Sequence, residues 1–106
     1  MTLKPTQRLK KRYISFTLHG DFTEEELSRE LYRHSLSFFG EYGLSKRTIK
    51  LLEFSGKQGT LLVNREAAEE VLGMLALING LGGKPARLIA RSSSGTLAAL
   101  KRKEKD

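Results

Sequence analysis

Cysteine and tryptophan are absent from this chain of 106 residues, and aromatic residues make up only 8% of it. Without cysteine the chain has no disulfide, no thiolate chemistry and no Cys-based zinc site, which fits a reducing intracellular compartment. No apolar run approaches the ~20 residues that span a bilayer, so we expect no membrane partner. Residues 1–12 are basic but no apolar stretch follows them, which argues against a secretory signal. The length suits a single domain.

Acidic residues are missing from two stretches, 1–12 and 84–103, within a chain whose net charge is +7. The first stretch holds five cations and the second six, so together they carry +11 and the remainder of the chain carries −4. This segregation favours a polyanionic partner such as a nucleic acid, while two solvated basic tails are the alternative explanation. The cations are Lys4, Arg8, Lys10, Lys11 and Arg12 in the first stretch, and Lys84, Arg87, Arg91, Lys101, Arg102 and Lys103 in the second.

The first third of the chain predicts one strand and one helix. Apolar and β-forming residues alternate with polar ones over 11–18, which predicts a half-buried strand. Thr23 and Glu26 have the spacing of a capping box, so we expect a helix that begins there and ends at Gly40. A loop over 40–43 then leads toward the second strand.

The rest of the chain completes an alternation of strands and helices. Asn64 is placed to cap a second helix that reaches Ile78, and Gly80 or the Gly82-Gly83 pair is placed to end it. We also expect strands at 48–54, 59–63 and 86–91, a turn at 55–58, a loop at 92–95 and a short helix at 96–103.

The order β-α-β-β-α-β predicts an α+β, ferredoxin-like or RRM-like sandwich, with a four-stranded antiparallel sheet and two helices on one face. A C-terminal helix is added to it. The single domain 1–106 then consists of a basic arm (1–10), a ferredoxin-like core (11–91) and a C-terminal helix with a basic tail (92–106).

The predicted topology brings the two basic stretches together. In this fold the first and fourth strands are antiparallel neighbours, so the start of one lies beside the end of the other. The arm that ends in Lys10, Lys11 and Arg12 should therefore emerge near Arg91 and the terminal helix. A polyanionic partner explains such a patch better than two independent tails do.

No pattern indicates a catalytic site or a metal site in the polypeptide. His19 and His34 have no partner pattern, and the acidic residues cluster at predicted helix starts, where they offset the helix dipole. No P-loop, Rossmann or Ser-His-Asp motif is recognisable. Enzymes do exist on ferredoxin-like folds, so the fold alone does not exclude activity.

Nucleic-acid binding is the function that the charge favours, since lysine and arginine neutralise phosphates without reading sequence. An RRM stacks bases on aromatic residues of its first and third strands. Here Tyr13 is the one candidate, with a structural role as its alternative, and the third strand has no aromatic residue. We therefore expect shape and backbone recognition by the basic edge, while exposed leucine-rich strands are open to a protein partner.

Ser94-Gly95-Thr96 precedes the terminal helix, and backbone amides at a helix start can hold a phosphate. Serine and threonine are also favoured as ordinary helix caps, which is the other interpretation of this tripeptide. We include it among the candidate RNA contacts, after the cations.

Several short motifs stand in a characteristic order over nearly the whole chain. They are Lys10-Lys11-Arg12-Tyr13-Ile14 with Phe16, Gly40-Glu41-Tyr42-Gly43 with Ser45-Lys46, Gly59 with Arg65, and Ser94-Gly95-Thr96-Leu97 followed by Lys101-Arg102-Lys103. In this order the chain resembles the small ferredoxin-like protein subunit of archaeal and eukaryotic ribonuclease P, archaeal protein component two. Relatives often carry an arginine where this chain has Leu62, which argues against an RNA contact from that strand. The compact chain favours an archaeal source.

The resemblance implies a noncatalytic subunit of the endonuclease that removes the 5′ leader from precursor tRNA. In that family the RNA performs the Mg²⁺-dependent hydrolysis, so no cofactor bound by the protein is implied. The implied partners are the RNase P catalytic RNA, precursor tRNA, a larger barrel-type protein subunit, and a second copy of the chain in a homodimer within a heterotetramer. The implied location is the cytoplasm for an archaeal protein and the nucleus for a eukaryotic one.

Two further functions stay open besides RNA binding. One is a protein-interaction module in another ribonucleoprotein, whose basic ends meet an acidic partner. The other is a small-molecule enzyme of acylphosphatase type, for which no phosphate-cradling loop with a partnered arginine is evident. The residues expected to contact RNA are Lys10, Lys11, Arg12, Arg91, Lys101, Arg102 and Lys103, followed by Tyr13, Lys46, Arg47, Ser94, Gly95 and Thr96.

Overall fold

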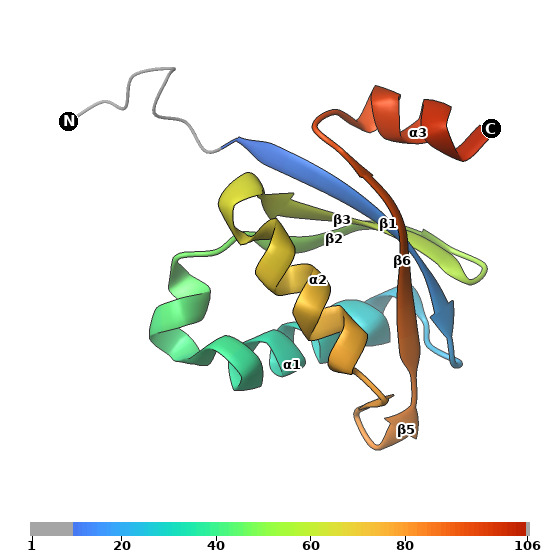
Figure 1. The fold of residues 1–106 in the computed structure, drawn as a ribbon. Helices are drawn as coiled ribbons and strands as arrows, with labels where there is room; N and C mark the ends of the chain where they lie inside the picture. The colour runs from blue at the N-terminus through green and yellow to red at the C-terminus, as the bar shows by residue number, and fades with distance from the viewer. Residues whose placement is uncertain (1–9, 106) are drawn as a thin grey trace.

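The main elements occur in the predicted order in a computed structural model, which describes residues 10–105 and the side chains of residues 10–103 (Figure 1). Residues 1–9 of the predicted arm lie outside the described residues, as does residue 106. The main strands are β1 (Lys11–His19), β2 (Ile49–Ser55), β3 (Gln58–Asn64) and β6 (Arg87–Ser94). The helices are α1 (Glu24–Ser45), α2 (Ala68–Leu77) and α3 (Leu97–Lys105), with a 3-10 turn, η2 (Arg65–Ala67), before α2 and a short ribbon of β4 (Gly80–Leu81) and β5 (Lys84–Pro85) after it.

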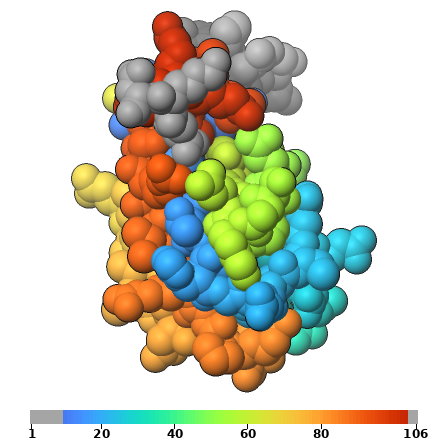
Figure 2. All heavy atoms as spheres, turned by 90° about the vertical axis from the view of Figure 1, so that its right-hand side faces the viewer, coloured from blue at the N-terminus to red at the C-terminus, as the bar shows by residue number. Residues whose placement is uncertain are grey.

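The four main strands form an antiparallel sheet in the order β2-β3-β1-β6. Helices α1 and α2 cover one face, and α3 lies on the opposite side of the sheet (Figure 1). Seen from the side of the β2–β3 turn, β6, β1 and the β2–β3 hairpin lie side by side, with α3 at one end (Figure 2). The α+β, ferredoxin-like prediction is therefore confirmed.

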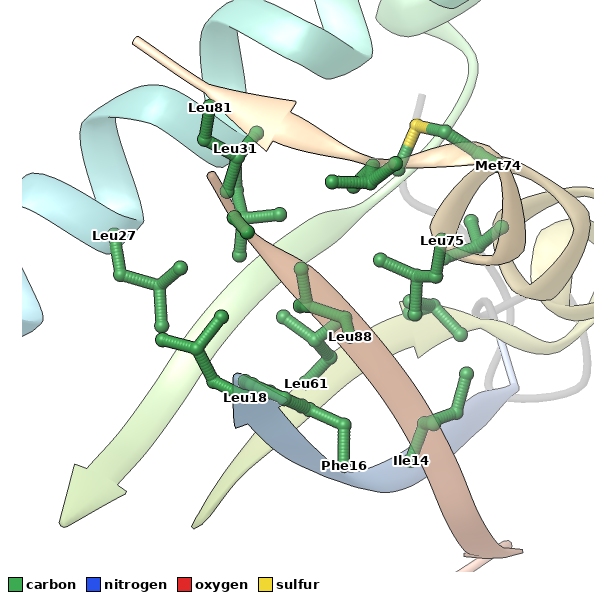
Figure 3. Close-up of a cluster of buried hydrophobic side chains, with 14 of the residues drawn as sticks. Ile14, Phe16, Leu18, Leu27, Leu31, Leu61, Met74, Leu75, Leu81 and Leu88 are labelled. Atoms are coloured by element: carbon green, nitrogen blue, oxygen red, sulfur yellow. The ribbon is translucent and has the colours of Figure 1, made fainter. Parts of the chain in front are cut away.

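The core lies between the sheet and the helices α1 and α2 (Figure 3). Ile14, Phe16 and Leu18 point into it from β1 and are at most 1% exposed, as their alternation predicts. Gly59 pairs with Phe16 across β1 and β3. A Cβ on Gly59 would lie 2.5 Å from the phenyl Cζ, so the absence of a side chain there makes room for the ring.

Helix α1 begins at the predicted capping box. The Glu26 amide donates to Thr23 Oγ1 at 3.1 Å, and the Thr23 amide donates to Glu26 Oε1 at 3.0 Å. The predicted break at Gly40 is present, because its φ of +76 and ψ of 169 are non-helical, but the predicted loop over 40–43 is wrong, because a second helical segment follows directly and continues to Ser45. Glycine adopts such a positive φ without steric cost, so Gly40 separates the two helical segments of α1 at a sharp kink.

Asn64 does not cap the following helix as predicted. Its side-chain Oδ1 accepts a hydrogen bond from the Thr48 amide at 2.9 Å, and it makes no capping bond to η2. The side chain is thus used to fix the start of β2 against the end of β3.

Two other boundaries differ from the sequence prediction. Helix α2 ends at Leu77, and Gly82 and Gly83 form the turn between β4 and β5 with φ values of +58 and +81. Strand β6 runs through residues 92–94, where a loop was expected. Ser15 Oγ lies 3.0 Å from the Ser92 hydroxyl and 3.2 Å from the Ser92 amide, so side-chain bonds extend the pairing with β1.

A candidate RNA interface at one end of the sheet

The starts of β1 and β2 and the ends of β3 and β6 lie at one end of the sheet. Lys11 pairs with Asn64 on one side of β1, and the Arg65 amide donates to the Lys10 carbonyl at 2.7 Å. On the other side of β1, Arg12 Nη1 is 3.9 Å from the position of a Cβ on Gly95. We call Lys10, Lys11, Arg12 and Arg65 the basic end of the sheet.

The predicted meeting of the start of β1 with the segment that leads into the terminal helix is confirmed for Lys11 and Arg12, but Arg91 is not their neighbour. Tyr13 pairs with Ser94, so β1 begins beside the last residue of β6. Arg91 stands in a bulge, between Ala90 and Ser92, and is exposed. Three residues of strand, about 10 Å, separate Arg91 from Ser94.

Arg65 is a cation at the basic end that was not among the predicted contacts. It is exposed and follows β3 directly. Because β3 runs antiparallel to β1, the residue after β3 must lie beside the residue before β1. That topological signal was present in the sequence.

Within Ser94-Gly95-Thr96, only Thr96 caps α3. The Ala99 amide donates to Thr96 Oγ1 at 3.1 Å, while Ser94 is a buried residue at the end of β6, 7% exposed. The hydroxyl of Thr96 thus takes one of the helix-start amides that a phosphate would otherwise use. Gly95 is exposed beside Arg12.

The contacts of helix α3 with the second face of the sheet include one fully buried leucine and two lysines. Leu100 is 0% exposed but lies outside the main core. Lys101 Nζ is 3.1 Å from Glu53 Oε1, and Lys103 Nζ donates to the Ser93 carbonyl at 2.8 Å. Lys101, Arg102 and Lys103 are all exposed, so α3 presents three cations on the second side of the sheet.

The position of α3 also bears on Tyr13. Ile14 faces the core, so Tyr13 faces the second side of the sheet, between its partners Leu62 and Ser94, and it is half-buried. An RRM leaves this face open for bases. Here α3 contacts β1 and β6, which leaves less of the face open to bases.

Lys46 and Arg47, which precede β2, make internal contacts. Lys46 Nζ lies 4.3 Å from the ring centre of Tyr42. Arg47 binds Glu70 through two guanidinium nitrogens and donates to the Gly43 carbonyl at 2.6 Å. Lys46 is exposed, whereas only 20% of the Arg47 side chain is. Arg47 is therefore the less accessible of the two to a phosphate.

A different, apolar surface lies along α1. Tyr32, Phe38 and Tyr42 are 61%, 47% and 64% exposed. Tyr32 also lines a groove of about 470 Å³, together with Leu36, Leu44 and Ile49. Glu41, Ser45 and Arg47 complete the lining. Exposed aromatic side chains beside a groove of mixed apolar and polar lining are typical of protein-binding surfaces.

Residues 10–105 contain no group of three acidic or histidine side chains that could hold a metal ion. His19 is exposed, and His34 Nε2 is buried without a hydrogen-bond partner among the described residues. In the same part of the chain, no helix has the length and apolar character needed to cross a membrane.

Residues 12–104 match the model of a known protein family, described as the Rpp14/Pop5 family. The chain belongs to this family. Among curated Rpp14/Pop5 relatives, ribonuclease P protein component 2 of Pyrococcus horikoshii is 39% identical over 96% of this chain and 88% of the relative. The Archaeoglobus fulgidus protein of the same name is 35% identical over 95% of this chain and 94% of that relative. A chain in the cryo-EM structure of yeast ribonuclease MRP has a TM-score of 0.57 at 12% identity, covering 94% of this chain and 95% of the other, and shares the fold.

Proposed function

We propose that this chain is an RNA-binding protein subunit of ribonuclease P, which supports the RNA-catalysed removal of the 5′ leader from precursor tRNA. The observation that carries the proposal is the near-full-length similarity to archaeal chains named ribonuclease P protein component 2. The basic end of the sheet supports it, because clustered cations favour binding to a phosphate backbone. The polypeptide is one subunit of the endonuclease and carries no catalytic group in this proposal.

The chain's own residues would act on the RNA by screening phosphate repulsion. Lys10, Lys11 and Arg12 are the first candidates, and Arg65 joins them because it lies beside Lys10. The Mg²⁺ ions belong to the RNA, which performs the hydrolysis, and the protein binds no cofactor. The remaining candidates are Tyr13, Lys46, Arg47, Arg91, Ser94, Gly95, Thr96, Lys101, Arg102 and Lys103.

The lysines of α3 would exchange their present partners for phosphates. Lys101 would leave Glu53, and Lys103 would leave the Ser93 carbonyl. Both partners of the Lys101–Glu53 pair are more than half exposed, and such pairs contribute only about 0–1 kcal/mol, so a phosphate can compete with them.

The proposed partners are the RNase P catalytic RNA, precursor tRNA and a larger barrel-type protein subunit, with the chain itself a homodimer within a heterotetramer. The exposed Tyr32 and Tyr42 of α1 support a contact with a protein subunit, because exposed tyrosines favour protein interfaces. The archaeal relatives support a cytoplasmic location in an archaeal cell.

Cleavage of precursor tRNA by the cognate RNase P RNA tests the proposal. The reaction is run with the barrel-type protein present, with and without this chain, over a series of Mg²⁺ concentrations. We expect the chain to stimulate cleavage and to lower the Mg²⁺ requirement, and to be inactive alone. No stimulation, under conditions in which the two proteins bind each other, would favour a protein-interaction module instead.

A further inference from the structure

The outer edge of β6 is a free strand edge. Among residues 10–105, β6 pairs only with β1 and is the last strand of the sheet. Backbone N–H and C=O groups on its other side are therefore available to a further strand. Arg87, Ile89, Ala90 and Arg91 are all exposed along this strand.

An apolar groove runs between this edge and α2. It has a volume of about 270 Å³ and is lined by Leu72, Leu75 and Ala76 of α2 and by residues 87–90 of β6. Ile89 on its rim is 46% exposed. The groove thus offers apolar side-chain contacts directly beside free backbone groups.

The charges around the groove favour a negatively charged partner. Of the residues that the structure describes, no acidic one lines the groove; the acidic residues of α2, Glu69 and Glu70, lie in its first turn, before the lining begins at Leu72. Arg87 borders the groove at the strand edge, and Arg91 stands exposed further along the same strand. A segment that binds here would therefore be favoured by negative charge.

We propose that the outer edge of β6 binds an extended, acidic segment of a protein partner as an additional strand. Successive side chains of such a strand point to opposite faces. On the α2 side, apolar side chains would fill the groove beside Leu72 and Ala76. On the other face, acidic side chains would lie next to Arg87. The expected sequence alternates apolar and acidic residues, as in other complexes formed by strand addition.

The same features favour a protein segment over RNA at this position. An RNA strand would use the arginines but neither the apolar wall nor the backbone groups of the strand edge. The other edge strand, β2, carries both Lys50 and Glu53 and so selects no single charge. The proposal concerns a surface separate from the basic end and does not rest on the RNase P function.

Titration of the ¹⁵N-labelled full-length chain with a short capped peptide that alternates valine and glutamate tests the proposal. We expect NMR shift changes confined to β6 residues 87–90 and to α2 around Leu72 and Ala76, and slower hydrogen exchange of alternate β6 amides. Shift changes at β2, or no change in β6 exchange, would overturn it.

Two variants of α2 provide a matched pair. Ala76→Glu places a negative charge on the groove wall, and we expect it to weaken peptide binding at least about tenfold through like-charge repulsion. Gly73→Glu adds the same charge to the same helix outside the groove, at an exposed position where a Cβ meets nothing within 4 Å. It should bind like the parent, and equal weakening by both variants would contradict the groove assignment.

Two further titrations test the other possible occupants. A short oligouridylate that shifts the β6 groove residues when the peptide does not would assign the groove to RNA and overturn the proposal. Dilution of the chain alone that moves the same resonances would show that a second copy covers the edge, which would also overturn it. We expect neither titration to move residues 87–90.

Discussion

Arg47 and Glu70 form a salt bridge that joins the segment after α1 to α2, with Nη2 2.8 Å from Oε2 and 2.9 Å from Oε1. The same guanidinium donates to the Gly43 carbonyl and lies 4.5 Å from the ring centre of Phe39. Three kinds of contact thus meet at one side chain. Arg47 therefore stabilises the end of α1 that lies beyond the kink at Gly40.

Replacement of Arg47 by alanine is expected to destabilise the fold more than it affects RNA binding. The pair with Glu70 and the packing on Phe39 together justify a loss of about 1–2 kcal/mol in the free energy of unfolding. Urea denaturation of the variant and the parent measures this loss. A variant that keeps its stability but shows a smaller salt dependence of RNA binding would place Arg47 among the phosphate contacts.

Neutralisation of the basic end is expected to weaken RNA binding and its dependence on salt. For Lys11→Gln with Arg12→Gln, the slope of log K against log salt should fall by about 0.7–0.9 for each phosphate that the protein no longer neutralises. Arg65→Gln should lower the slope by the amount expected for one phosphate. The measurement is a filter-binding or fluorescence titration with the RNase P RNA at several salt concentrations.

Arg29 and Arg33 of α1 provide the matched control for this experiment. Their side chains are 59% and 70% exposed and lie away from the basic end. Arg29→Gln with Arg33→Gln removes the same charge and should leave the slope unchanged. Equal slopes for both double variants would mean that net charge, and not the basic end, determines RNA binding.

Leu100→Ala should release α3 while leaving the main core intact. Leu100 is fully buried under α3 but is not part of the core between the sheet and the other helices. We expect the α3 amides to exchange hydrogen faster and the free energy of unfolding to fall by about 2–3 kcal/mol, at the low end for buried leucines. RNA affinity should fall as well, because α3 carries three of the candidate cations. Unchanged exchange in α3 would show that other contacts hold the helix.

Acid should destabilise the protein through two carboxylates near the start of α1. The hydrogen bond from Lys57 holds the pKa of Asp21 below its usual value, and the hydrogen bonds from the Thr23 amide and then from Lys84 do the same for Glu26. A lowered pKa in the folded state stabilises it above the unfolded-state pKa, which is about 4 for both groups. That stability is lost as the pH falls through the lower, folded-state values.

Urea unfolding between pH 6 and pH 3 measures this dependence. In the Asp21→Asn and Glu26→Gln variants, the free energy of unfolding should fall less steeply as the pH is lowered. High salt should have part of the same effect, because it screens the lysines. Glu25→Gln removes a carboxylate from the same helical turn without removing these contacts and serves as the control. If the free energy of unfolding of the Glu26→Gln variant fell with pH as steeply as that of the parent, this account would be contradicted.

The sequence predicted the sheet topology because its main signals are local and agree with one another. The alternation around Phe16 and the capping box at Thr23 and Glu26 each depend on residues a few positions apart, and both are present in the structure. Strand order then followed from the ferredoxin-like pattern. The same topology correctly placed the start of β1 next to the terminal helix.

The features that the sequence missed depend on contacts between distant residues. Asn64 is a good helix cap in isolation, but its side chain bonds to Thr48 across the sheet. Residues 92–94 resemble a loop until Ser15 supplies side-chain bonds from β1. Gly40 does break the helix, but the sequence did not show the helical segment that follows it, where Arg47 donates to the Gly43 carbonyl and is itself bound to α2.

The candidate site was predicted in part for the same reason. Charge identified Lys11 and Arg12, and topology brought them to the terminal helix. The sequence alone did not show that Glu70 forms a salt bridge with Arg47, or that Glu53 forms one with Lys101. These partners lie 23 and 48 residues apart along the chain.

The β2–β3 turn offers an attachment point for a spectroscopic label. The paired residues of β1 and β3 run from Lys11 and Asn64 at the basic end to Thr17 and Gln58 next to the turn, a length of about 20 Å. Because the chain has no cysteine, Ser55→Cys would give a single reactive thiol at an exposed position in this turn. A fluorophore attached there would leave the basic end unobstructed, so energy transfer to a dye on the partner RNA would follow assembly of the complex in real time.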